Sequence, residues 1–235
     1  MTAGPATITP LGDRALVVHV GDGIGDDVFR RVQAALHRLR AAHPAIVDLV
    51  AGYTSVTVHY DPVAIDASNG DAPWATLARQ VAEAVSDLDA VDLPAARTVE
   101  IPVCYDGALA PDLERVADHA GLSPASVIAL HCAATYTVQM IGFTPGFPYL
   151  AGLDPRLATP RLSEPRTRVV AGSVGIGGEQ TGIYSLATPG GWNIIGSTPL
   201  SLFDPAREPP SLLRVGDCVH FTRIDRARYD AMVRR

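Results

Sequence analysis

The alternation of apolar and polar residues in the first part of the chain predicts a small α+β domain. The stretch "TITPLGDRALVVHV" ends in a run typical of a β-strand, and residues 46–52 and 53–62 indicate two more strands. Apolar residues at helical spacing favour helices over residues 25–42 and 74–88. The expected order is β-α-β-β-α-β, with "RTVEIPVCY", residues 97–105, as its last strand.

A domain boundary is expected near residue 95. The segment "DAVDLPAA", residues 89–96, follows the second helix and has the composition of a linker. The sequence therefore predicts one domain over residues 1–95 and a second over residues 96–235.

The second part of the chain begins with helical patterns and then changes character. Residues 110–121 and 123–134 predict two short helices, the first ending at Gly121 and the second starting at the pair Ser123-Pro124. Eleven glycines follow between Gly142 and Gly196. Short apolar runs such as "YTVQMIGF", "RVVAGSVGI", "TGIYSLA", "WNIIGST", "PLSLF" and "DCVHFTRI" alternate with turn residues. This pattern favours a mainly β barrel or sandwich.

Composition and charge narrow the function classes. With 235 residues, of which 47% are apolar, the chain can bury a substantial core. A net charge of −6 argues against nucleic acid as a partner. No apolar run approaches the roughly 20 residues that span a bilayer, and the start has no signal-peptide pattern, so a cytoplasmic protein without membrane contact is expected.

Several familiar active sites are excluded by the residues present. The chain has no lysine, which excludes a Walker A phosphate loop and a Schiff-base mechanism. No H-E-x-x-H and no G-x-S-x-G occur, and three distant cysteines give neither a zinc framework nor a disulfide scaffold. "AGSVGIGGEQTG" fails the dinucleotide pattern because Gln180 stands at its third glycine position. No metal site is therefore expected in this chain.

The remaining candidate chemistry lies in four segments rich in glycine, proline and aromatic residues, "GFTPGFPYL", "PRLSEPRTRV", "GGEQTGIY" and "TPGGWNIIG". Their rings can wall a binding site, and their polar side chains can orient a ligand. The substrate-binding candidates are Phe143, Phe147, Tyr149, Arg161, Arg166, Gln180, Thr181, Tyr184 and Trp192. The alternative is that these segments are tight turns with aromatic residues in the core.

His131 is the candidate for proton transfer, because it ends an apolar helical face just before the glycine-rich region. The alternative is a core histidine bonded to the backbone. Cys132 follows it directly, and adjacent helical residues point about 100° apart, so the two do not form an activated thiol pair.

The stretch from "GFTPGFPYLAGL" to "STPLSLFDP" closely resembles the family of the B-type subunit of bacterial 5-oxoprolinase, also described as allophanate hydrolase subunit 1 and as the kinase-A inhibitor KipI. The segments "LGDRALVV", "YTSVTVHYDP", "IPVCYDG" and "RVGDCVHF" extend the resemblance over nearly the whole chain. The same unit occurs as subdomains C and D of the carboxyltransferase part of urea carboxylase.

The resemblance implies an α+β N-terminal domain followed by a mainly β, cyclophilin-like barrel. It also implies a partner, the homologue of the C-type subunit of 5-oxoprolinase or of allophanate hydrolase subunit 2, and a third component related to the A-type, lactam-utilisation subunit. The implied activity is ATP-dependent opening of 5-oxo-L-proline to L-glutamate, or hydrolysis of allophanate, with ATP used by the complex. A regulatory module that inhibits a sensor histidine kinase is the alternative function.

Overall fold

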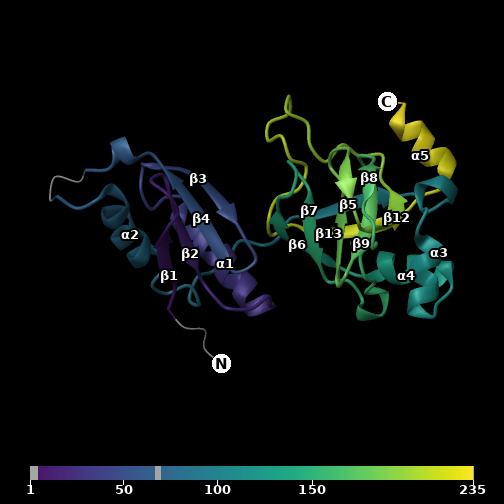
Figure 1. The fold of residues 1–235 in the computed structure, drawn as a ribbon, viewed down its shortest axis with the longest axis horizontal. Helices are drawn as coiled ribbons and strands as arrows, with labels where there is room; N and C mark the ends of the chain where they lie inside the picture. The colour runs from purple at the N-terminus through teal and green to yellow at the C-terminus, as the bar shows by residue number, and fades with distance from the viewer. Residues whose placement is uncertain (1–4, 67–69, 235) are drawn as a thin grey trace. The chain divides into compact units, whose positions relative to one another are not determined.

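The computed structural model describes residues 5–66 and 70–234. The chain divides into two compact units, Met1–Ala95 and Ala96–Arg235. Each unit has its own sheet and its own helices (Figure 1).

The first unit is a four-stranded antiparallel sheet with two helices. Its elements are β1 (Thr7–Pro10), β2 (Ala15–His19), α1 (Asp26–Leu39), β3 (Ile46–Ala51), β4 (Ser55–Tyr60), the short 3-10 helix η1 (Pro62–Ala64) and α2 (Pro73–Ala84). The strand order in the sheet is β1-β2-β4-β3. Helix α1 contacts β3 and β4 while α2 contacts β1 and β2, so the two helices together cover the sheet (Figure 1).

Alternation along β4 explains which face of this sheet the helices cover. Val56, Val58 and Tyr60 are buried, whereas the residues between them are partly exposed. Such a period of two places every second side chain on the same face. Helix α1 presents the matching apolar stripe, which includes the fully buried Val32 and Leu39.

The second unit is built on a seven-stranded, barrel-like sheet. Its strands are β5 (Thr98–Val103), β6 (Tyr136–Ile141), β7 (Pro148–Ala151), β9 (Ser173–Gly177), β10 (Gln180–Ile183), β12 (Asn193–Ser197) and β13 (Cys218–Arg223), in the spatial order β12-β9-β10-β7-β6-β13-β5. The two end strands meet, because Cys104, just after β5, exchanges two backbone hydrogen bonds of 2.9 Å with Ser197 of β12. This bridge nearly closes the sheet into a barrel.

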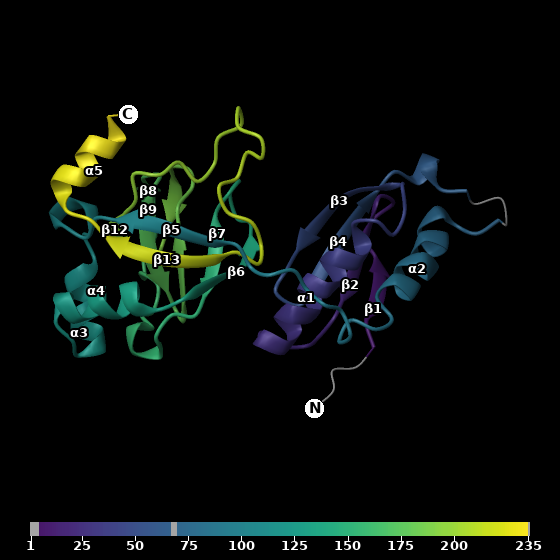
Figure 2. The same ribbon diagram turned by 180° about the vertical axis from the view of Figure 1, so that it is seen from behind.

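The other elements of the second unit surround this barrel. They are η2 (Gly107–Leu109), α3 (Leu113–Ala120), α4 (Pro124–Ala133), η3 (Pro155–Leu157), α5 (Arg226–Val233) and the two-stranded ribbon of β8 (Arg166–Val169) with β11 (Thr188–Gly190). Helices α3 and α4 contact each other, and α4 packs on β13 (Figure 2).

Sequence signals set the ends of α3 and α4. Gly121 ends α3 with a left-handed φ of 65°, a conformation that glycine adopts without strain. Ser123 begins α4, where its hydroxyl accepts a 3.2 Å hydrogen bond from the Ser126 amide and Pro124 occupies the first turn. These two helices and their end signals are as predicted.

The predicted fold class is confirmed: an α+β unit precedes a mainly β, barrel-like unit. Two expectations on individual elements were wrong. The stretch 97–105 does not complete the first sheet, because β5 pairs in parallel with β13 of the barrel. The strand expected over "PLSLF" does not form, and of this stretch Phe203 makes an isolated bridge to Ser211. The strand expected at the end of "TITPLGDRALVVHV" is confirmed as β2, and β1 is an additional strand that forms a hairpin with it, with Gly12 at a φ of 67° between them.

Candidate functional site

A pocket of about 290 Å³ lies in the second unit, and its lining includes several aromatic side chains. Five of the predicted rings and one predicted arginine line it, namely Phe143, Phe147, Tyr149, Arg161, Tyr184 and Trp192. Leu162, Pro165, Pro189, Gly190 and Gly191 complete the lining. We call this site the aromatic pocket. Its residues come from four separate segments of the chain, so it exists only in the folded unit.

Phe147 is the centre of the aromatic wall. Its ring makes edge-to-face contacts with those of Tyr149, Tyr184 and Trp192, at centroid distances of 4.9, 5.3 and 5.5 Å. Each such contact stabilises by about 0.5–1.5 kcal/mol beyond the area that it buries. Phe147 is 2% exposed, so the wall is held by packing and does not depend on a ligand for its shape.

The turn before Phe147 carries an exposed aromatic side chain, that of Phe143. Phe143 has a φ of 67° and is 62% exposed, and the Thr144 amide donates to the Gly142 carbonyl at 2.8 Å. This is a γ-turn with positive φ at its centre, the rarer and more strained form. The Phe143 ring contacts the Phe147 ring at a centroid distance of 5.6 Å. The turn therefore stores backbone strain while placing an exposed aromatic ring at the edge of the pocket.

Hydrogen bonds fix this turn to the barrel. The Ser185 hydroxyl donates to the Pro145 carbonyl at 2.6 Å and lies 3.3 Å from the Thr144 hydroxyl. Gly146 follows with a φ of 76°, and a Cβ there would lie 2.8 Å from the Cβ of Phe203. The glycine is thus required both by its conformation and by the close approach of its neighbour.

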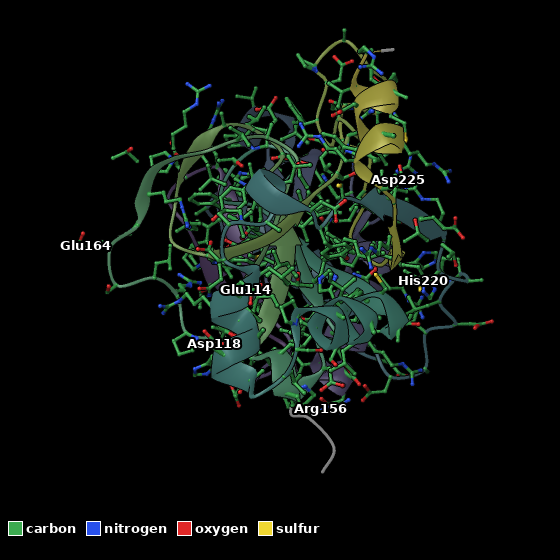
Figure 3. All side chains as sticks on the ribbon, turned by 90° about the vertical axis from the view of Figure 1, so that its right-hand side faces the viewer. Glu114, Asp118, Arg156, Glu164, His220 and Asp225 are labelled. Carbon is green, nitrogen blue, oxygen red and sulfur yellow. The ribbon has the colours of Figure 1, made fainter. Side chains whose placement is uncertain are left out.

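A loop that carries Arg161 forms another part of the pocket lining. Its guanidinium carbon lies 5.8 Å from the centre of the Trp192 ring, within the range of a cation–π contact. The loop is tied to the barrel by the Leu162 amide, which donates to the Gly191 carbonyl at 2.7 Å. Figure 3 shows Glu164, from the same loop, pointing outward into solvent. Among the lining residues that the structure describes, Arg161 is the charged one.

The adjacent glycines Gly190 and Gly191 differ in how much space there is for a side chain. A Cβ at Gly190 would overlap the hydroxyl of Tyr184, whereas a Cβ at Gly191 would meet no atom nearer than 3.6 Å. Gly190 is therefore needed for the present position of the Tyr184 ring, and Gly191 is not.

The side chains that line the aromatic pocket can bind a ligand and donate hydrogen bonds to it, but none of those described can act as a proton acceptor. Burial raises the pKa of Tyr149 and of Tyr184 above the ordinary value, so both hydroxyls stay protonated at neutral pH. Arg161 is a permanent cation. The described lining contains no carboxylate and no histidine. These groups suit the recognition of a small carboxylate or amide with a flat, partly apolar body.

His131 lies elsewhere, sealed in the core of the barrel. It is fully buried, and its ring stacks on Phe221 at a centroid distance of 4.4 Å. Burial lowers the pKa of His131 to about 3, so the ring is neutral at physiological pH. The alternative to proton transfer, a core histidine, thus fits its position better, although its ring bonds to side chains and not to the backbone.

A directed chain of hydrogen bonds assigns the tautomer of His131. The Thr181 hydroxyl donates to the Gly175 carbonyl at 3.0 Å, so it accepts from His131 Nε2 at 3.2 Å. Nδ1 is then the acceptor for the Tyr105 hydroxyl at 2.9 Å. Thr181 is fully buried within this chain, so its hydroxyl serves the core and does not face the aromatic pocket.

The two other predicted site residues also lie outside the aromatic pocket. Arg166 forms an ion pair with the buried Asp112 at 2.6 Å. Gln180 begins β10 and pairs with Gly177. The sequence prediction missed Asp112 and Tyr105 as partners, because their contacts join segments far apart in the chain. Gly190, Pro165 and Leu162 lie in two of the four segments rich in glycine, proline and aromatic residues, but no local signal distinguishes these residues from their neighbours.

The part of the chain that the structure describes lacks both a metal-binding cluster and a helix able to span a membrane. It contains no group of three or more metal-binding side chains placed to hold an ion. None of its helices combines the length and apolar character needed to cross a bilayer. The cysteines Cys104, Cys132 and Cys218 are free thiols.

Comparison with known proteins places the chain in a family. A family model described as "Carboxyltransferase domain, subdomain C and D" matches residues 6–213. The B-type subunit of 5-oxoprolinase from Bacillus subtilis is 43% identical over 228 residues, covering 95% of each chain. The corresponding 5-oxoprolinase subunit from Escherichia coli O157:H7 is 44% identical over 214 residues, covering 90% of this chain and 93% of the relative.

A solved structure is similar to this chain in both fold and sequence. The crystal structure of TTHA0988 superposes with a TM-score of 0.74 at 40% identity, covering 90% of this chain. The matched part is 40% of the TTHA0988 chain, so that protein is much longer than this one. From the family model and these relatives, we conclude that the chain belongs to the family of carboxyltransferase domains, subdomain C and D.

Proposed function

We propose that the chain is one component of an ATP-dependent amidohydrolase of the 5-oxoprolinase type, and that its aromatic pocket is one wall of a shared active site. The observation that carries the proposal is the near end-to-end match to relatives named as the B-type subunit of 5-oxoprolinase, which covers 95% of both chains in the Bacillus subtilis case. The name of those relatives describes a part of a larger enzyme. The aromatic pocket fits that description, because it can bind a substrate and lacks a proton acceptor.

Within the proposed site, the substrate is a small cyclic or planar amide with a carboxylate. Arg161 pairs with the carboxylate, and the rings of Phe147, Tyr149 and Trp192 contact the flat body of the substrate. The Tyr149 and Tyr184 hydroxyls remain donors at neutral pH and orient the amide carbonyl. The volume of about 290 Å³ is at the small end of ligand pockets, which suits a compact substrate.

The proposed partner is a homologue of the C-type subunit of 5-oxoprolinase, with a homologue of the A-type, lactam-utilisation subunit as the third component. In this arrangement the partner supplies the proton acceptor that the aromatic pocket lacks. ATP is consumed by the assembled complex.

Reconstitution tests the proposal. The chain is mixed with its C-type and A-type partners, and ATP hydrolysis is measured with and without 5-oxo-L-proline. We expect substrate-dependent ATP hydrolysis by the mixture and none by the chain alone. Full turnover by the purified chain alone would refute the shared site, and a mixture inactive on 5-oxo-L-proline would refute the substrate.

A matched pair of glycine variants locates the site. Gly190→Ala displaces the Tyr184 ring and is expected to lower turnover about 5- to 30-fold, because the misplaced ring loses a contact worth about 1–2 kcal/mol. Gly191→Ala has room for the added methyl group and should retain activity. Co-purification with the partner should be unchanged in both variants. If Gly190→Ala keeps full activity, the aromatic pocket is not the substrate site.

A further inference from the structure

A second pocket, of about 150 Å³, lies beside β8 in the same unit. Its polar side chains include Arg166, Arg168 and Ser173, and its apolar wall includes Leu109, Val169 and Ile194. We call it the Arg166 pocket. None of the residues that line it lines the aromatic pocket. It is therefore a separate cavity with its own cationic groups.

Arg166 is anchored in this pocket and is incompletely bonded. Its Nη2 donates to Asp112 Oδ1 at 2.6 Å, and the other oxygen of Asp112 accepts from the Ile194 amide at 2.7 Å. Asp112 is therefore satisfied by two charge-assisted hydrogen bonds. Arg166 Nη1, by contrast, is buried and has no hydrogen-bond partner among the described residues. A buried donor without a partner is unusual in a folded protein and points to a missing acceptor.

The charge of the pocket favours an anion. Asp112 neutralises Arg166, while Arg168 is exposed and has no ion-pair partner among the residues that the structure describes. The described lining includes no acidic side chain. The hydroxyl of Ser173 makes no hydrogen bond within the described part of the chain, so it is a further donor for an anion.

The apolar part of the lining favours an organic acid over an inorganic anion. Leu109, Val169 and Ile194 would face the hydrocarbon part of an organic acid, whereas all oxygens of a phosphate need polar partners. We propose that the Arg166 pocket binds a small organic carboxylate, held by Arg166, Arg168 and the Ser173 hydroxyl. Because Nη1 is shielded from solvent, binding requires a local shift of the lining side chains.

Titration of the full chain with propionate tests this proposal. Calorimetry at constant ionic strength compares sodium propionate with propionamide, which has the same shape and no charge, and with sodium phosphate. Saturable binding of propionate, with no binding of propionamide, is the expected result. No saturable binding of propionate, or equal binding of propionamide, would overturn the proposal. Tighter binding of phosphate than of propionate would overturn the assignment to carboxylates.

Arginine variants test whether propionate binds in the Arg166 pocket. Arg168→Gln is expected to weaken propionate binding about tenfold or more, because it removes one charge-assisted hydrogen bond. It leaves the Arg166–Asp112 pair intact, so the fold should be unaffected. The control is Arg156→Gln, an exposed arginine of η3 outside both pockets, which should bind propionate normally. Unchanged binding in Arg168→Gln, or equal weakening in Arg156→Gln, would overturn the assignment to the Arg166 pocket.

Discussion

The neutral, buried imidazole of His131 makes the stability of the second unit depend on pH. In the folded chain the pKa of His131 is about 3, because burial disfavours the charged ring, whereas an unfolded histidine has its ordinary pKa of about 6.5. Below pH 6.5 the unfolded chain therefore binds a proton that the folded chain does not. By linkage, the free energy of unfolding falls as the pH is lowered through this range.

The two pKa values set the size of the effect. Between pH 7.5 and pH 5, His131 alone lowers the free energy of unfolding by about 2 kcal/mol, as calculated from a folded pKa of about 3 and an unfolded pKa of about 6.5. This is a substantial share of the roughly 5–15 kcal/mol by which most proteins are stable. Solvent does not screen this contribution to the free energy of unfolding, because the His131 side chain is fully buried.

Urea unfolding at the two pH values measures this effect. The chain contains two tryptophans, so a Trp74→Phe background leaves Trp192 as a fluorescent reporter of the second unit. Replacing His131 with glutamine should remove about 2 kcal/mol of the pH dependence, and replacing the exposed His119 should not. In the original protein, the NMR signal of the His131 ring should not titrate between pH 5 and 8. A His131 that titrates near pH 6 would refute the reasoning, as would equal pH dependence in both variants.

Three further predictions concern stability, measured by urea unfolding. Phe143→Gly should be more stable than Phe143→Ala by about 1 kcal/mol, because a φ of 67° strains any residue that has a Cβ; equal stability would contradict the strain. Asp112→Asn should lower the free energy of unfolding by about 1–3 kcal/mol, since it breaks a partly buried ion pair, and the exposed Asp118→Asn is its control. Leu150→Ala should lower it by about 2–5 kcal/mol, because the side chain is fully buried, whereas Val233→Ala, at a position 58% exposed, should change it by less than about 0.5 kcal/mol.

Local signals in the sequence were sufficient where an element depends on its own residues. The ends of α3 and α4 follow from Gly121 and from Ser123-Pro124, whose effects on the backbone are local. The pairing of β5 was not predictable in this way. Its alternating pattern fits either sheet, and its partner β13 lies more than a hundred residues later in the chain. Strand existence is a local property, whereas strand partnership is decided by tertiary packing.

The candidate site shows the same division. Phe147 and Trp192 come from two of the segments rich in glycine and aromatic residues, and they lie in one cluster. The direction of each polar side chain could not be derived, because neighbouring residues on a strand face opposite sides. Thr181 consequently points into the core, to His131, although it lies in a segment that suggested ligand binding. For Arg166, the buried partner Asp112 was the missing information.

The chemistry of the aromatic pocket limits what this chain can do without a partner. Hydrolysis of an amide needs donors that stabilise the developing oxyanion and a group that accepts a proton from water. Arg161, Tyr149 and Tyr184 provide donors only, since burial raises the pKa of both tyrosines and a guanidinium does not lose its proton. His131 cannot supply the missing base, because it is sealed in the barrel core. In the proposed complex the base therefore comes from the partner, and the exposed Phe143 ring at the edge of the pocket is an apolar group that the partner would contact.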